Sequence, residues 1–138
     1  MGFLKDNGIG VNHQEMIPIQ NFNDGQGLQG YDIDNKEYMM SNVESFDYDD
    51  VDVYLKITFE DDAVITTTKD QLFRVDDEWI MAENLKIGDF CKKTNELSFI
   101  EDIEIKNIEL IEETNISFKF INVTPNGLFF VERIMTHC

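Results

Sequence analysis

The segment Trp79-Ile80-Met81-Ala82-Glu83-Asn84-Leu85-Lys86-Ile87-Gly88-Asp89 changes structural character over a short distance. It begins within the second of two β-type runs, residues 72–75 and 78–81, which are separated by the turn-forming pair Asp76-Asp77. Residues 81–86 are long enough for one helical turn, and the Gly-Asp pair that follows favours a tight turn. The segment therefore predicts a β-hairpin that continues into a single helical turn.

Alternating and β-branched runs favour strands in much of the remaining chain. We expect strands over residues 51–59 and 64–68, one long strand or a strand pair over 100–111, and strands over 117–123 and 128–135. The run over 100–111 changes phase near Lys106-Asn107, the last two runs are joined by the turn sequence Thr124-Pro125-Asn126-Gly127, and the glycine-rich residues 24–30 predict a loop. Short strands at this spacing predict a compact all-β domain.

The composition of the chain excludes several classes of protein. It has 138 residues, with 11 Lys plus Arg against 28 Asp plus Glu, and a formal net charge of −17. The length predicts a single domain over residues 1–138, and an aromatic content of 12% is enough to build a core. Because the charge repels phosphate groups, we expect neither nucleic acid nor an anionic membrane as a partner.

The cysteine content and the N-terminal residues bear on the compartment. Cys91 and Cys138 are too few for a disulfide scaffold or a zinc site. The chain has no run of about 18 apolar residues, so we expect no membrane span. Residues 1–6 lack the apolar core of a signal peptide. We therefore expect a cytoplasmic monomer with free thiols, encoded by a bacterium or a phage.

No motif predicts a metal ion or another cofactor. Residues 32–37 resemble the opening of an EF-hand loop, but the sixth and twelfth positions lack the glycine and glutamate that the loop needs. The acidic run over residues 47–52 predicts a solvated loop in preference to a cation site. His13 and His137 are far apart in sequence, and His137 is poorly placed to chelate together with its neighbour Cys138.

The last residues, Met135-Thr136-His137-Cys138, are suited to chemistry on a peptide bond. An imidazole beside a peptide carbonyl polarises it or transfers a proton, and an adjacent thiol is a nucleophile. One interpretation is that the chain ends here arbitrarily. The other is that the final peptide bond is itself the site of chemistry, and both interpretations stay open at this point.

Four segments match, in order and spacing, the motifs of one family. Residues 2–9 fit Cys-x-x-x-Asp-Thr-x-Val, and residues 68–73 fit Thr-x-x-His followed by an apolar pair. Residues 79–89 fit W-x-x-A-x-x-L-x-x-G-D, which is the most specific match, and residues 126–138 follow a C-terminal pattern that ends in His-Asn. Over nearly its whole length the chain thus resembles the Hint domain of inteins, bacterial intein-like domains and the Hedgehog autoprocessing module.

The resemblance implies a horseshoe-like, all-β Hint fold of two pseudo-symmetric halves, with the two chain ends close together. It implies a mini-intein without an endonuclease, flanked by the polypeptide segments (exteins) of a host protein. In the family the first thiol attacks the preceding carbonyl, and the Thr-x-x-His motif stabilises and protonates the scissile amide. The first residue of the downstream segment then takes over the acyl group, and the terminal Asn cyclises with help from the penultimate His.

Several positions depart from the residues that this chemistry needs. The departures are Gly2 at the first nucleophile, Gln71 at the histidine of Thr-x-x-His, Gly127 at the C-terminal motif histidine and Cys138 at the terminal Asn. Thr68, Asp6, Asp89 and His137 keep the family residues. Glycine has no nucleophile, glutamine does not transfer protons near neutral pH, and cysteine cannot form a succinimide. The resemblance therefore implies a splicing domain that is inactive in this form.

Three explanations of these departures stay open. The ends were altered to trap a precursor, or a natural Hint-fold domain lost catalysis and became a structural or interaction module. In the third, Cys138 is the downstream nucleophile and the register of the last two residues shifts by one. An accidental match by an unrelated acidic β-barrel predicts no proximity between Gly2, Thr68 and Cys138, and this separates it from all three.

Overall fold

The computed structural model describes residues 1–12, 14–23, 25–95, 97 and 99–138, and strands account for most of them. The strands are β1 (Phe3–Leu4), β2 (Gly8–Gly10), β3 (Met16–Pro18), β4 (Leu28–Asp32), β5 (Glu37–Val51), β6 (Tyr54–Phe59), β7 (Val64–Thr67), β8 (Leu72–Val75), β9 (Glu78–Met81), β10 (Phe90–Thr94), β11 (Ile100–Ile111), β12 (Asn115–Thr124), β13 (Leu128–Val131) and β14 (Ile134–His137). Two short 3₁₀ helices, η1 (Ile19–Asn21) and η2 (Ala82–Asn84), interrupt them. No helix among the described residues has the length and apolar character needed to cross a bilayer.

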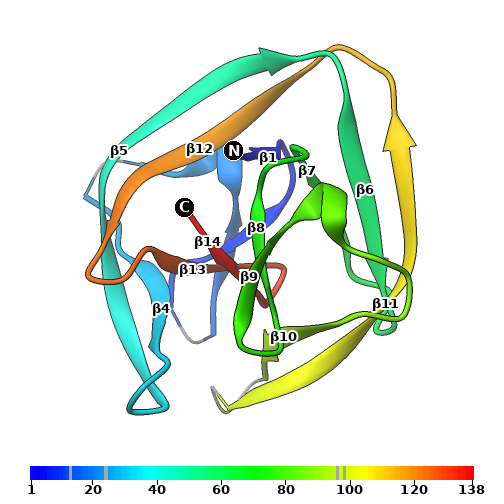
Figure 1. Ribbon diagram of the computed structural model, residues 1–138. Coiled ribbons are helices and arrows are strands. Elements are labelled where there is room, and N and C mark those ends of the chain that lie inside the picture. Colours follow the sequence, from blue (N-terminus) through cyan, green and yellow to red (C-terminus); the bar gives the residue numbers. More distant parts are fainter. Residues whose placement is uncertain (13, 24, 96, 98) are drawn as a thin grey trace.

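The strands form one antiparallel sheet in the order β3-β2-β13-β14-β8-β10-β11-β6-β7-β1-β12-β5-β4, with β9 paired to β8. Two long pairs, β5–β12 and β6–β11, lie on opposite sides of the molecule and frame the two halves of the horseshoe (Figure 1). The sheet turns back toward itself where Asn126 Nδ2 donates to the carbonyl oxygen of Tyr31 at 2.8 Å. The predicted all-β architecture is confirmed.

The core lies inside this curved sheet and contains phenylalanine side chains from distant parts of the sequence. The ring of Phe3 packs edge-on against Phe73 and Phe129, with centroids 6.3 and 6.0 Å apart. Phe120 packs edge-on against Phe129 at 5.1 Å. Edge-to-face geometry places the positive ring edge against the negative ring face and stabilises such pairs beyond simple burial. Because Phe3 follows Gly2 directly, the core holds the beginning of the chain in place.

Several local predictions are confirmed. Residues 72–75 and 78–81 form the β8–β9 hairpin, and Ala82–Asn84 form the single helical turn after it. Residues 100–111 form one strand, and its pairing with β6 shifts register between Ile105 and Asn107, where the phase of the sequence changes. Such a bulge inserts an extra residue and bends the strand.

The strand predicted over 128–135 is wrong, because the chain reverses within it. Residues 128–131 and 134–137 are two paired strands, and Glu132 and Arg133 between them have φ angles of 49° and 66°. Two successive residues with positive φ form the tight hairpin turn that suits the twist of the strands. Glu132 is held there because its N–H donates to the Gly8 carbonyl at 2.7 Å and its Oε1 accepts the Gly8 N–H at 2.6 Å.

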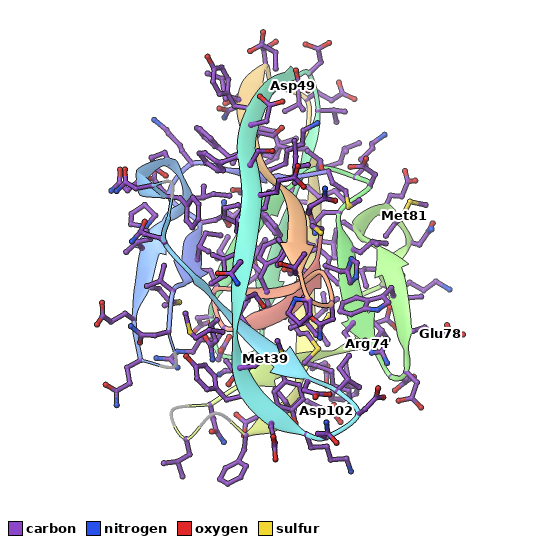
Figure 2. All side chains as sticks on the ribbon, turned by 90° about the vertical axis from the view of Figure 1, so that its left-hand side faces the viewer. Met39, Asp49, Arg74, Glu78, Met81 and Asp102 are labelled. Atoms are coloured by element: carbon purple, nitrogen blue, oxygen red, sulfur yellow. The ribbon has the colours of Figure 1, made fainter. Side chains whose placement is uncertain are left out.

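The loop predicted for the acidic run over 47–52 is wrong as well. Its residues up to Val51 belong to β5, which pairs with β12 from Asn42 to Val51, and Asp49 lies near one end of the molecule (Figure 2). These carboxylates are exposed, so solvation was predicted correctly and backbone structure was not. β5 also ends at Val51, so the strand predicted from residue 51 begins only at Tyr54. Residues 28–30, expected within a loop, begin β4.

Asn7 ties the beginning of the chain to β7. This buried side chain donates from Nδ2 to the Leu4 carbonyl at 2.7 Å and to Thr66 Oγ1 at 2.8 Å, and its Oδ1 accepts the Thr66 N–H at 3.0 Å. Asn7 therefore joins β1 and β7 through both ends of its side-chain amide.

We predict that Asn7→Ala lowers the free energy of unfolding by about 2–3 kcal/mol, because it leaves buried backbone groups of Leu4 and Thr66 without partners. Urea denaturation monitored by tryptophan fluorescence measures this change. Asn107→Ala, at an exposed position of β11, is the control and should change the value by less than about 0.5 kcal/mol. Equal effects of the two substitutions would contradict the prediction.

Candidate functional site

The carbonyl oxygen of Gly2 is surrounded by hydrogen-bond donors from β7 and the residue after it. It accepts from the Thr68 N–H at 3.0 Å and from the Thr67 hydroxyl at 2.9 Å, and Thr68 Oγ1 lies 3.4 Å away. Thr67 is fully buried. The β7–β8 connection therefore holds the backbone at Gly2 through preorganised donors, which is the kind of arrangement that stabilises a polarised carbonyl.

The Thr68 hydroxyl has a better acceptor than Gly2. It lies 2.8 Å from Asp70 Oδ1, and because a hydroxyl has one proton, the shorter bond to Asp70 takes it. The other oxygen, Asp70 Oδ2, lies 3.1 Å from the α-ammonium of Met1. Partial burial raises the pKa of Asp70, but the Thr68 hydroxyl and the Met1 ammonium outweigh it and hold the pKa below its ordinary value. A carboxylate therefore lies beside the peptide bond between Met1 and Gly2.

The backbone at Gly2 leaves no room for a side chain. A Cβ atom there would lie 2.5 Å from the carbonyl oxygen of Phe118 and 3.1 Å from its carbonyl carbon, both backbone atoms of β12. A cysteine at this position therefore requires β1 and β12 to move apart. Glycine here is matched to its surroundings as well as lacking a nucleophile.

Gln71 acts on the other end of the chain. Its side chain is 1% exposed, and Nε2 donates to the His137 carbonyl oxygen at 2.8 Å. Its backbone carbonyl accepts the Ala82 N–H at 2.8 Å, so the first residue of η2 also fixes the backbone of Gln71. The amide of Gln71 thus polarises the peptide carbonyl between His137 and Cys138 without being able to transfer a proton.

The ring of His137 lies over Gly127. A Cβ atom at residue 127 would come within 2.5 Å of both Cε1 and Nε2 of His137, and Gly127 has a φ of 77°. Trp79 packs edge-on against the same ring, with centroids 4.9 Å apart. Within the last residues, His137 Nδ1 lies 2.7 Å from the Cys138 carbonyl oxygen, and the Cys138 N–H donates to Gly127 at 2.9 Å. The absence of a side chain at 127 is therefore what gives His137 its position.

One connection, residues 67–71, contacts both ends of the chain. Thr67 and Thr68 bind the carbonyl of Gly2, Gln71 binds the carbonyl of His137, and the Gln71 N–H lies 3.4 Å from the Thr68 carbonyl. The strands agree with this placement, because β1 pairs with β7 and β14 pairs with β8. Figure 1 shows both chain ends toward the centre of the molecule. Gly2, Thr68, Gln71 and His137 thus meet at this connection, while Gly127 lies under the His137 ring and accepts the Cys138 N–H.

Other residues singled out in the sequence lie elsewhere or have structural contacts. Asp6 exchanges two hydrogen bonds with Gln20, and Asp89 Oδ2 accepts the Lys86 N–H within its turn. Cys91 is fully buried, and burial followed by the charge of Asp89 raises its pKa to about 12, so it forms no thiolate near neutral pH. His13 lies outside the described residues, and among those described no group of three or more His, Cys, Asp or Glu could hold a metal ion.

Sequence reasoning missed three residues of the site. Thr67 was assigned only to a strand, Asp70 was treated as an unspecified motif position, and Trp79 was considered only as part of a motif. The β-branched run that contains Thr67 predicted its strand correctly, but no local signal distinguishes the one threonine whose hydroxyl reaches Gly2. The contact of Trp79 with His137 depends on pairing between β8 and both β9 and β14.

No protein-family model matches the chain, and no curated protein has significant sequence similarity to it. Solved structures do match. A bacterial intein-like domain from Clostridium thermocellum has a TM-score of 0.85 at 19% identity, covering 99% of this chain and 98% of that chain. A DnaB intein from Synechocystis sp. PCC 6803 has 0.88 at 13%, covering 99% and 97%, and a DnaX mini intein from Spirulina platensis has 0.84 at 17%, covering 100% of both.

We predict that Gly127→Ala lowers the free energy of unfolding by about 1–3 kcal/mol more than Gly88→Ala does. Both glycines have positive φ, at 77° and 95°, but a Cβ at Gly88 meets nothing within 4 Å, so that variant isolates backbone strain from the clash with His137. Chemical denaturation measures the difference, and the NMR signals of the His137 ring should shift only in Gly127→Ala. An unchanged ring environment in both variants would contradict the assignment.

Proposed function

Since the chain has the Hint fold of inteins, we propose that it is an intein-type protein-splicing domain that is inactive in its present form. In this proposal residues 1–138 are one domain without an endonuclease, placed between two flanking segments of a host protein. The domain is a cytoplasmic monomer, and its flanking segments, rather than nucleic acid or membranes, are its partners. Bacterial intein-like domains and inteins of similar fold over the full chain support this proposal.

The observation that carries the proposal is the connection over residues 67–71, which binds the carbonyls of Gly2 and His137. A domain that exchanges the segments before and after it must bring both junctions to one set of groups. Donors from a single connection do this here, and they are buried, where a hydrogen bond to a developing oxyanion is strongest. The scaffold for acyl transfer is thus retained.

The missing groups account for the inactivity. Gly2 has no thiol or hydroxyl, so no acyl shift passes through the first residue. Gln71 donates a hydrogen bond but supplies no proton to a leaving nitrogen. Cys138 has no side-chain amide that could attack its own carbonyl, so the cyclisation step of the family has no counterpart. Each missing group removes a covalent or proton-transfer step, and the remaining donors cannot replace it.

A degenerate structural or interaction module is the second candidate. The fit of glycine at residues 2 and 127 favours it, because side chains there would clash with Phe118 and with His137. A domain in which only the ends had been altered to trap a precursor has no reason to lack space at both positions. In this second view the Hint fold remains as a rigid support that brings two segments of a host protein together.

A third candidate rests on the bond from Gln71 to the His137 carbonyl. If Cys138 is the downstream nucleophile, that carbonyl belongs to the scissile bond and Gln71 serves as its oxyanion donor. A fragment that ends at His137, formed by cleavage of the peptide bond between His137 and Cys138, would identify this register.

We predict that the chain, placed between two marker proteins of different mass, remains intact for a day at neutral pH. Mass spectrometry of the purified fusion distinguishes intact precursor, separated markers and ligated markers. Ligated markers would refute the inactivity, and a fragment that ends at His137 would support the third candidate. A fusion with Cys138→Ser serves as the control, because its downstream bond has a poorer nucleophile.

Restoring the missing groups separates the first candidate from the second. We predict that Gly2→Cys together with Cys138→Asn and a downstream cysteine recovers N-terminal cleavage by added thiol, because the donors around Gly2 remain. Recovery should be partial, since the Cβ at residue 2 forces β1 away from Phe118. The same fusion with Gly2→Ser is a control of lower nucleophilicity. Complete inertness, even with Gln71→His added, would support the degenerate module.

A further inference from the structure

A cleft of about 420 Å³ lies beside the junction at Gly2. Its walls come from the end of β5 and the turn after it, from the β7–β8 connection, from β12 and from Met1. The lining residues that carry the argument are Met1, Asp49, Asp50, Asp52, Asp70 and Lys119. We call this the upstream cleft, because Met1, the residue before Gly2, lies in it.

The position of Met1 shows which part of a polypeptide the upstream cleft receives. The Met1 nitrogen lies 3.1 Å from Asp70 Oδ2, so the backbone has already entered the cleft at this residue. In a fusion the same nitrogen is a peptide N–H, which can donate to the same carboxylate oxygen. A segment that precedes Met1 would therefore start inside the cleft, which Asp49 to Val53 also line.

The charges that Asp49 to Val53 bring to the cleft are mostly uncompensated. Asp49 Oδ2 lies 4.0 Å from Lys119 Nζ, at the limit of an ion pair. The carboxylate of Asp52 accepts only a 3.3 Å hydrogen bond from the Thr114 hydroxyl, and the carboxylate of Asp50 has no hydrogen-bond or ion-pair partner among the residues that the structure describes. Four carboxylates line the cleft against the ammonium groups of Lys69 and Lys119. The cleft therefore has an acidic lining.

We propose that the upstream cleft binds the polypeptide segment preceding Gly2 and selects basic side chains in it, with Asp49, Asp50 and Asp52 as the specificity-determining residues. The inference rests on the proposed function, which places a flanking segment there. Lys or Arg side chains two to four residues before Gly2 reach the three carboxylates and form ion pairs with them. An acidic segment at the same place is repelled and leaves the cleft open.

The geometry predicts that the stabilisation by a basic segment is local and sensitive to salt. The carboxylates are solvent-exposed, so each pair with a basic side chain contributes modestly and several must act together. Because exposed charges are screened within about 10 Å at 0.1 M salt, a pair in the cleft weakens as salt is added. The net charge of −17 also attracts any basic segment without regard to place, so the experiment must separate the cleft from this general attraction.

The test uses fusions that carry Lys-Arg-Lys, Ser-Ser-Ser or Glu-Asp-Glu directly before Met1. At 20 mM NaCl we expect the basic segment to raise Tm by about 3–6 °C over the serine segment, and 500 mM NaCl should remove the difference. Asp49→Asn, Asp50→Asn and Asp52→Asn combined should remove it at low salt. The matched control, Asp76→Asn, Asp77→Asn and Glu78→Gln combined, removes the same charge at the distant β8–β9 turn (Figure 2) and should keep it.

Equal Tm values for the basic and acidic segments would overturn the proposal. So would loss of the difference in the control variant, because that result means general attraction by the whole molecule. NMR provides a second readout, in which amide signals over residues 50–53 shift with the basic segment alone. Mass spectrometry of the same fusions reports on the proposed function separately, since release of the upstream segment contradicts inactivity while Tm of the intact fusion still decides the role of the cleft.

Discussion

The hydrogen bonds from residues 67–71 to the two ends of the chain are the constraint on which the rest of the site depends. Thr67 and Thr68 bind the Gly2 carbonyl, and Gln71 binds the His137 carbonyl. These bonds form only because β1 pairs with β7 and β14 pairs with β8, which places both ends next to one connection. The sheet, the phenylalanine core behind β1 and the bonds of Asn7 serve this placement, because a shift in any of them separates the two carbonyls.

Local patterns were sufficient for the fold class and for most turns, because period-two alternation and β-branched runs depend on neighbouring residues. The failures have a common physical reason. The turn Glu132-Arg133 lacks the Asn-Gly composition that is typical of a tight turn. Both residues have positive φ because Gly8, far away in sequence, accepts the Glu132 N–H and donates its own N–H to the Glu132 side chain. The acidic end of β5 was assigned to a loop because of its charge, and it is a strand because β12 pairs with it. Both outcomes depend on tertiary contacts, which a local pattern does not contain.

The candidate site, like the fold, could be predicted from the sequence only in part. The motif spacing singled out Gln71 and Gly127 as positions of interest. It did not predict what the substituted residues do there, since that depends on distances. Gln71 is a buried donor to a peptide carbonyl, and the absence of a side chain at Gly127 leaves room for the His137 ring. Residues 71 and 127 depart from the motifs that the sequence resembles, yet each has a defined structural role.

The ring of His137 over Gly127 couples the two positions. The imidazole occupies the space in which a side chain at 127 would lie, and Trp79 packs edge-on against the same ring. A Cβ atom at 127 meets the ring at 2.5 Å and is unfavourable unless His137 moves. Substitutions at 127 and 137 are therefore not additive in their effects on stability, and the two positions form an epistatic pair.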